Sequence, residues 1–215
     1  MAPRNEVKER ILRAAADLFM ERGFAGTTVR EIGEMADVGQ SSLYHHAHSK
    51  GQLLSELHRN FSGELFDLLT EVGSSDASPT VQLRELIRAL MSVVDTHRPV
   101  VTVYLRESYA LSEDAHEEVE QERTKIVAIV DTILRKGRET GEFRADLDIR
   151  LTRLAILGMC NWSYQWYNPN GPHTIDQISK EFADLVVLGV LDRTPTRPKT
   201  SKPNRSAKLV KQNAS

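Results

Sequence analysis

One stretch near the N-terminus constrains the fold more than any other: TTVREIGEMADVGQSSLYHHAHSK. Thr28 and Glu31 have the spacing of a capping box, in which two side chains satisfy free backbone N–H groups at a helix start. Gly39 interrupts the helical pattern, and Ser49 with Gln52 repeats the capping spacing. The stretch therefore predicts two short helices separated by a tight turn and followed at once by a third helix.

The middle helix of this stretch has a polar surface. Only Leu43 and Ala47 occupy inward apolar positions. The other positions are Gln40, Ser41, Ser42, Tyr44, His45 and His46. Their side chains carry the donors and acceptors that read base edges and phosphates in DNA. Adjacent histidines on a helix point about 100 degrees apart, so DNA contact by His45 and His46 is favoured over a metal site.

Phosphate contacts are predicted beside this helix. Lys50 falls in the first turn of the following helix, where a cation opposes the helix dipole. A bound anion such as DNA phosphate would remove that conflict, and a solvated surface lysine is the alternative. Thr28 and Arg30, at the start of the preceding helix, are the other predicted phosphate contacts.

These features resemble the N-terminal helix-turn-helix of the TetR family of transcriptional repressors, over residues 7–57. The segments that carry the resemblance are FMERGF (19–24), TTVREI (27–32), SLYHH (42–46) and Ser49-Lys50. The chain departs from the family at Ala47, where phenylalanine is usual, and at Gly39, where serine is usual. The first change would loosen packing under the middle helix, and the second removes a capping hydroxyl.

The resemblance implies an all-α protein with two domains. A three-helix DNA-binding domain is expected over residues 1–50, and a helical ligand-binding and dimerisation domain over residues 51–193. The last two helices, over residues 148–168 and 174–192, are expected to pair with their copies in a four-helix bundle. Such a protein binds a palindromic double-stranded DNA operator as a homodimer and leaves it when a small effector binds.

Apolar residues recur at helical spacing through the rest of the chain. A long helix is predicted from Lys50 to Val72, which is long enough to join the two domains. The segment from Val100 to Tyr109 is apolar on most sides and is predicted to be a buried central helix.

Composition limits where the chain works. One cysteine, Cys160, excludes an internal disulfide and fits a reducing cytoplasm. No apolar run is long enough to span a membrane, and the N-terminus lacks the apolar core of a signal peptide. The formal net charge is -2, but residues 194–215 contain six basic residues and no acidic residue. That segment predicts a disordered basic tail, and whether it contacts DNA is left open.

Aromatic residues near the end of the penultimate helix indicate the effector. Trp162 and Trp166 share one helix face, either as core or dimer packing or as the wall of a ligand pocket. The segment from Trp162 to Pro172 resembles TetR-type repressors that sense coenzyme A thioesters of fatty acids or steroid fragments. An acyl-CoA is therefore the expected effector, with a lipophilic drug as the alternative. The predicted pocket residues are Tyr104, Arg106, Glu107, Met159, Trp162 and Trp166.

Two other classes of protein remain as alternatives: a helical scaffold that simply dimerises, and a small-molecule-binding enzyme with a helix-turn-helix head. The sequence contains no nucleophile elbow, no paired acids at diagnostic spacing and no phosphate loop. No catalytic residue, cofactor or metal is therefore predicted.

Overall fold

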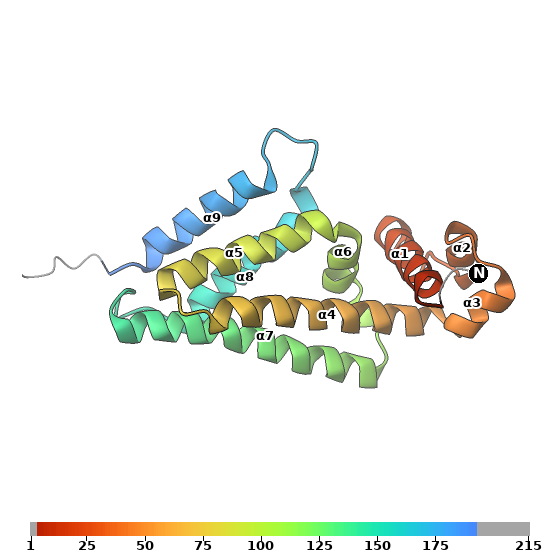
Figure 1. Ribbon diagram of the computed structural model, residues 1–215, viewed down its shortest axis with the longest axis horizontal. Coiled ribbons are helices and arrows are strands. Elements are labelled where there is room, and N and C mark those ends of the chain that lie inside the picture. The colour runs from red at the N-terminus through yellow and green to blue at the C-terminus, as the bar shows by residue number, and fades with distance from the viewer. Residues whose placement is uncertain (1–3, 193–215) are drawn as a thin grey trace, which may run out of the picture.

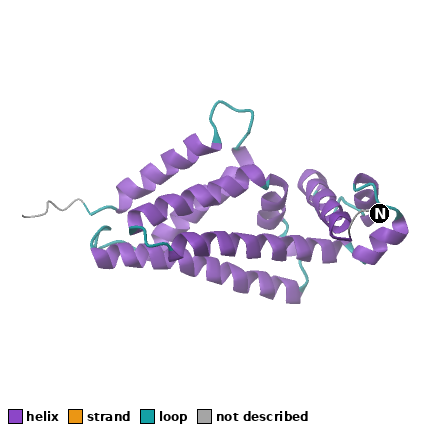
Figure 2. Ribbon diagram, in the orientation of Figure 1, coloured by secondary structure: helices purple, strands orange, loops and turns teal. Residues whose placement is uncertain are grey.

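The structure is a computed structural model that describes residues 4–192, and helices joined by short loops make up most of it (Figure 1, Figure 2). In chain order the helices are α1 (Arg4–Arg22), α2 (Val29–Met35), α3 (Gln40–His46), α4 (Lys50–Ser74), α5 (Pro79–Thr96), α6 (Arg98–Arg106), α7 (Glu113–Thr140), α8 (Ile149–Trp166) and α9 (Ile175–Val190). Between residues 4 and 192 there is no β-strand, and the all-α prediction is confirmed. The predicted basic tail, residues 194–215, lies outside the described residues.

The helix starts near the N-terminus follow the capping patterns of the sequence. The Thr28 hydroxyl accepts from the Glu31 amide at 3.3 Å, and the Glu31 carboxylate accepts from the Thr28 amide at 2.8 Å. The Ser49 hydroxyl accepts from the Gln52 amide at 3.1 Å. The Gln52 side chain, however, accepts from the His48 amide at 3.0 Å. In this second capping box the Gln52 side chain therefore bonds to the residue before the N-cap instead of to the N-cap itself. α4 still begins where expected.

Two hydrophobic cores divide the molecule, and α4 contributes to both. We call α1–α3 and the start of α4, which surround the N-terminal core, the head. The rest of the described chain is called the body. The head core reaches along α4 as far as Leu57, and the body core begins at Phe61. In Figure 1 the head forms one end of an elongated molecule, and α4 runs from it into the body. One continuous helix therefore joins the two cores.

The body is organised around α5, which packs against α4, α7, α8 and α9. Its inner face is fully buried at Leu83, Leu86 and Ile87. α7 lies along α4 (Figure 1), and α9 packs on the opposite side of α5. Within residues 4–192, no helix is both long and apolar enough to cross a membrane.

The segment predicted as a buried central helix, Val100–Tyr109, is shorter and lies at a junction. α6 ends at Arg106, and the chain then forms a 3-10 turn, η1 (Ser108–Ala110). Within α6 only Val101, Thr102 and Val103 are buried, and the buried Glu107 follows directly after the helix. α6 packs on α1 of the head as well as on α4 and α5. Its apolar surface therefore faces both cores instead of the centre of one.

Candidate DNA-binding surface and ligand cavity

Close contacts fix the turn between α2 and α3. A Cβ atom at Gly33 would lie 2.6 Å from the end of the Leu43 side chain, so a larger residue there would force Leu43 to shift. Asp37, between the helices, adopts a left-handed φ of 50°, which aspartate tolerates better than most residues. The Arg10 guanidinium of α1 donates to the carbonyl oxygens of Ala36 and Asp37, the two residues that follow α2.

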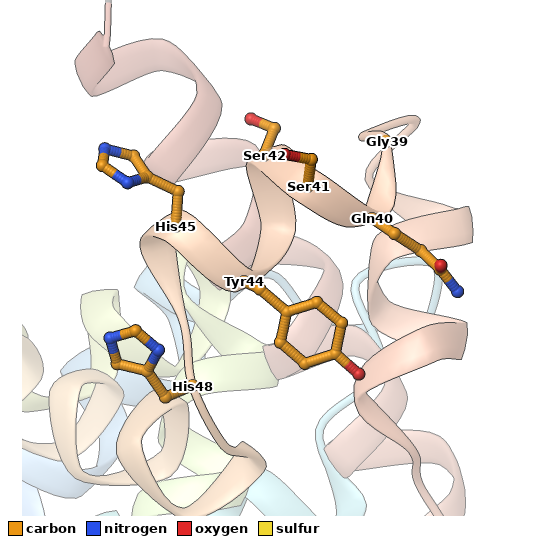
Figure 3. Close-up of a pocket in the computed structure, with 7 residues that line it drawn as sticks. All are labelled: Gly39, Gln40, Ser41, Ser42, Tyr44, His45 and His48. Atoms are coloured by element: carbon orange, nitrogen blue, oxygen red, sulfur yellow. The ribbon is translucent and has the colours of Figure 1, made fainter.

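α3 presents a polar face to solvent while two apolar residues hold it to the head. Leu43 and Ala47 are 1% and 0% exposed, whereas Tyr44 is 53% exposed. Figure 3 shows Gln40 and Tyr44 projecting from the same side of α3, as residues four apart do. An open hollow on this surface is lined by Gly39, Gln40, Ser41, Ser42, Tyr44, His45 and His48.

The structure therefore brings together five of the residues predicted to touch DNA, and it adds His48. The sixth residue of α3 in that set, His46, is half-buried, with its ring 5.3 Å from the ring of His45. α3 carries no Lys, Arg, Asp or Glu. Its neutral amide, hydroxyl and imidazole groups suit base edges, and an α-helix fits the major groove of DNA.

Two of the three predicted phosphate contacts lie at the start of α2. The Thr28 hydroxyl is exposed but is committed to Glu31, to which it donates at 2.7 Å. The Arg30 side chain is 77% exposed and donates through Nε to Glu34 at 2.9 Å. That bond leaves the two terminal nitrogens of Arg30 to meet a phosphate.

The third predicted phosphate contact, Lys50, has its ammonium turned into the head. Nζ donates to backbone carbonyl oxygens in the segment between α1 and α2. Lys50 also lies over the ring of Phe24, 4.4 Å from its centre. The Lys50 cation therefore lies at the start of α4, as predicted, but its partners in the structure are backbone carbonyls of the protein itself.

The body contains a partly open cavity of about 460 Å³ bounded by residues of α4 to α8. Apolar side chains such as Phe61, Leu90 and Leu157 line most of it. The polar residues of the lining are Tyr104, Ser108, Glu120, Arg123, Arg153 and Asn161. A mostly apolar cavity with a few polar groups is typical of small-molecule sites.

Of the six residues predicted to contact a ligand, Tyr104 lines this cavity. Its ring lies 4.9 Å from the ring of Phe61 and 5.3 Å from that of His58, both on α4. Burial raises the pKa of the Tyr104 hydroxyl, so the group remains protonated and can donate a hydrogen bond.

Arg106 and Glu107 lie outside the cavity lining, at the contact of α6 with α1. Glu107 is 3% exposed, and a Cβ atom at Gly23, just after α1, would be 3.5 Å from its Oε1 atom. The Arg106 guanidinium is 3.5 Å from that same oxygen. The two charges therefore sit between the head and the body.

The remaining three predicted residues are on α8, away from the lining. Met159 is half-buried, whereas Trp162 and Trp166 are 62% and 48% exposed. The two tryptophans are among the exposed large apolar side chains of α8 and α9, and we call this set of residues the α8–α9 face. Its large exposed side chains are Leu151, Leu154, Trp162, Trp166, Leu185 and Leu188.

Sequence reasoning missed the polar part of the cavity. Arg123 pairs with Glu120 at 3.2 Å, and Arg153 pairs with Asp131 at 2.6 Å. These residues are on α7 and α8, and the cavity exists only after five helices have packed. No local spacing in the sequence identifies these polar residues. The available signal was an arginine within an otherwise apolar helix, such as Arg153, which the structure shows to be half-buried.

Comparison with known proteins places this geometry in a family. Residues 11–57 match the family described as "Bacterial regulatory proteins, tetR family", and residues 76–190 match "Tetracyclin repressor-like, C-terminal domain". The chain belongs to the tetR family.

Similar members of the tetR family include repressors with known names. The chain is 33% identical over 187 residues to the "HTH-type transcriptional repressor KstR2" of Mycobacterium tuberculosis, covering 86% of this chain and 94% of that protein. The solved structure of the "ketosteroid transcriptional regulator KstR2" from the same organism has a TM-score of 0.82 at 32% identity, over 89% of this chain and 97% of the other. AibR, solved "in complex with isovaleryl coenzyme A and operator DNA", has a TM-score of 0.73 at 27% identity, over 86% and 98% of the two chains.

KstR2 is named a transcriptional repressor and not an enzyme. The chain is accordingly a DNA-binding transcriptional repressor of this family, and the polar surface of α3 lies in the helix-turn-helix portion that the family match covers.

Proposed function

We propose that this repressor binds a palindromic operator as a homodimer and is released when a hydrophobic effector, an acyl-CoA, enters the body. The observation that carries the proposal is the outer surface of α3, where neutral donors and acceptors surround a helix anchored only by Leu43 and Ala47. A helix with such a surface has no packing role outside the head, and it supplies the groups that base edges pair with.

The DNA contacts follow from this arrangement. The α3 residues enter the major groove or lie against its phosphates; they are Gln40, Ser41, Ser42, Tyr44, His45 and His46. Thr28 and Arg30 meet the phosphate backbone beside them. Arg30 keeps free donors for that purpose, whereas the Thr28 hydroxyl would have to exchange its bond to Glu31.

A second copy of the chain covers the α8–α9 face. An apolar surface that includes Trp162, Leu185 and Leu188 is unfavourable in water, and pairing of α8 and α9 with their copies would bury it. A two-fold axis then places two α3 helices on successive major grooves, about 34 Å apart, which fits a palindromic operator.

The effector assignment rests on the cavity and on the relatives. A volume of about 460 Å³ is large enough for an acyl group but not for a whole coenzyme A. The AibR complex contains isovaleryl coenzyme A, and KstR2 is named as a ketosteroid regulator. We therefore place the acyl group in the cavity against Tyr104, with the coenzyme A portion outside. A lipophilic drug in the same cavity is the alternative.

The cavity reaches the α8–α9 face. Leu154 and Gly158 line the cavity and are also exposed on the outer side of α8. A partner subunit on this face would therefore lie next to the cavity opening. Trp162, Trp166 and Met159 follow on the same helix, and we retain them as ligand contacts at that opening instead of inside the cavity.

α4 provides the route from effector to DNA. We propose a DNA-binding domain over residues 1–50 and an effector domain over residues 51–193. With this division, α4 belongs to the second domain except for its first residue. Its N-terminal turns nevertheless pack in the head core, and Phe61 and Leu65 line the cavity. An effector that binds best when α4 has shifted would favour a spacing of the α3 helices that no longer fits the operator.

The test combines binding and release. Acyl-CoAs, the matching free acids and lipophilic cations are screened for thermal stabilisation, and each stabilising compound is then tested for release of a palindromic duplex in a gel shift. We expect Leu157→Trp to weaken effector binding by about tenfold, because the larger side chain fills part of the cavity and removes space for the ligand. Operator affinity should not change. Leu157→Met, which conserves volume, is the matched control.

The outcomes separate the parts of the proposal. Stabilisation without operator release would contradict the signalling route. A response to lipophilic cations but to no acyl-CoA would replace the effector class and leave the repressor assignment intact. Full effector response in Leu157→Trp would place the effector outside the cavity.

A further inference from the structure

The ammonium group of Lys50 uses all its donors inside the protein. Nζ donates to the carbonyl oxygens of Phe24 at 2.8 Å, Thr27 at 3.1 Å and Ala25 at 3.4 Å. A lysine ammonium has three N–H groups. In this conformation none remains for a phosphate oxygen, and the ring of Phe24 covers another side of the charge.

The carbonyl groups around Lys50 belong to one tight turn between α1 and α2. Gly23 begins the turn with a left-handed φ of 75°. The Thr27 hydroxyl holds the turn to the end of α1, donating to the carbonyls of Gly23 at 3.0 Å and Leu18 at 3.3 Å. The Phe24 ring packs against Phe19 of α1, with centroids 5.4 Å apart. The turn is therefore a shaped receptor for one small cation.

This receptor also resolves the helix-dipole conflict at the start of α4. A cation in the first turn of a helix is unfavourable unless negative charge lies nearby. The oxygen ends of the three carbonyl dipoles supply that charge without any bound phosphate. The feature of the sequence that indicated a phosphate contact therefore has a sufficient explanation within the head.

The contact connects three helices. Lys50 is the first residue of α4, and the carbonyl of Thr27 immediately precedes Thr28, the N-cap of α2. α2 in turn carries α3 through the close packing of Gly33 on Leu43. The Lys50 ammonium therefore joins the start of α4 to the pair of helices that presents the DNA-binding surface.

We propose that Lys50 is a positioning residue, which sets the orientation of α2 and α3 relative to α4, and that it does not bind DNA phosphate. The proposal rests on the DNA contact by α3 that is proposed above. A positioning residue affects binding to the operator far more than binding to random DNA, because only base readout depends on the exact placement of α3. A phosphate ligand affects both alike and contributes to the salt dependence.

Substitution by arginine separates the two roles. Arginine keeps the positive charge and binds phosphate at least as well as lysine does. Its planar guanidinium, however, is too large for a site formed by three converging carbonyls, where the compact ammonium fits. Lys50→Arg should therefore preserve a phosphate contact but damage the positioning contact, and Lys50→Met should remove both.

The experiment measures the Kd of the full-length chain for two duplexes over a range of salt concentrations. One duplex is a palindrome recovered by in vitro selection with the wild-type protein, and the other is random. Arg13→Met, which removes an exposed cation from α1, is the control for loss of one charge. We expect both Lys50 variants to raise the operator Kd by about tenfold or more, the scale of one mismatched base pair. The random-duplex Kd and the salt slope of Lys50→Met should match those of the Arg13→Met control, and those of Lys50→Arg should match the wild type.

Three results would overturn the proposal. The first is a Lys50→Met variant that weakens both duplexes equally and lowers the salt slope by about 0.9, the value for one phosphate. The second is a Lys50→Arg variant with wild-type operator affinity. The third is a Lys50→Met variant with wild-type operator affinity.

A measurement on the wild-type protein does not depend on whether the variants fold. Proton–nitrogen NMR of lysine ammonium groups should show a slowly exchanging Lys50 signal in the free protein, because three carbonyls hold its protons. The signal should persist when the selected duplex is added. A Lys50 signal that appears only with DNA would refute the positioning role. If no duplex binds the wild-type protein, the proposed DNA contact fails, whereas the signal of the free protein still tests the carbonyl site.

Discussion

The outer surface of α3 and the α8–α9 face are both exposed in a single chain, but their chemistry is opposite. On α3 the exposed groups are amide, hydroxyl and imidazole, and Tyr44 supplies a single large ring. On the α8–α9 face, large apolar side chains dominate, with Leu151 and Leu185 each 64% exposed. The two faces therefore have different relations to water.

The difference indicates how long each face stays covered. The polar groups of α3 are well solvated when free, so DNA can leave without a large cost. Burying a fully exposed large apolar side chain contributes about 1.5–3 kcal/mol, and the side chains of the α8–α9 face, about half exposed, still have part of that to gain. A permanent partner on the α8–α9 face and an exchangeable partner on α3 are what a dimeric repressor requires.

The largest expected effect comes from a charge on the α8–α9 face. Leu185→Glu should make the protein monomeric, because a two-fold axis would bury two carboxylates among apolar side chains. Operator affinity should fall by about a hundredfold or more, since each head would bind its half-site alone. Sedimentation and gel shift measure the two effects.

Val81→Glu provides the matched control for this prediction. Val81 is 46% exposed on α5 and is not one of the residues that form the α8–α9 face. The control should remain dimeric with wild-type operator affinity. A dimeric Leu185→Glu protein that still binds the operator normally would show that the apolar face has some other partner.

A smaller effect is expected on α3. Tyr44→Ala should raise the operator Kd by about tenfold, comparable to one mismatched base pair, and leave random DNA nearly unchanged. The exposed ring lies on the surface that we propose reads bases, so its loss would remove a specific contact. Tyr109→Ala, at a tyrosine 76% exposed in the body, should change neither value. Equal weakening on both duplexes would mean that Tyr44 contacts only the backbone.

The head could be predicted in more detail than the body because its signals are local. The Thr28–Glu31 box acts between residues three apart, and it produces the expected start of α2. Gly39 likewise caps α3 at the predicted position. Lys50 shows the limit of this reasoning, because its partners lie 23 to 26 residues earlier in the chain. A local argument identified the unfavourable charge but not the group that compensates it.

The cavity depends on packing that no spacing reveals. Trp162 and Trp166 share a helix face, as their spacing requires, but spacing does not say whether that face points to a cavity or outward. Their exposure identifies the outward direction. The arginines of the lining, in contrast, are separated in sequence by the rest of α7, a loop and the first turn of α8, and only the packed body brings Arg123 and Arg153 to one cavity.

The junction between the head and the body contains a titratable group that neither outer face shares. His58 of α4 is 0% exposed, and its Nδ1 atom lies 2.9 Å from the Leu54 carbonyl oxygen. Because a carbonyl only accepts, Nδ1 carries the proton and the ring can be neutral. Nε2 is buried without a hydrogen-bond partner. The environment therefore favours the uncharged imidazole.

The smallest expected effect is a pH dependence of stability at this junction. Burial lowers the pKa of His58 below its ordinary value, although the backbone of Leu54 and of Tyr104 and then the Glu107 carboxylate act in the opposite direction. Between the lowered folded pKa and the ordinary pKa of about 6.5, the unfolded chain binds more protons than the folded protein does. The contribution of His58 to stability is therefore complete above about pH 6.5 and is lost as the pH falls toward the folded pKa.

Thermal unfolding of wild type and His58→Gln between pH 8 and pH 5 tests this sign. On acidification the melting temperature of the wild type should fall relative to that of His58→Gln. The reason is that the unfolded wild-type chain binds a proton at His58, and folding must then either release this proton or bury the charged ring. His116→Gln, at an exposed histidine of α7, should follow the wild-type curve throughout. If the His58→Gln and wild-type curves remain parallel, the imidazole is not held neutral at the junction. The pH dependence would then have to arise on the outer faces, where several exposed histidines, including those of α3, are found.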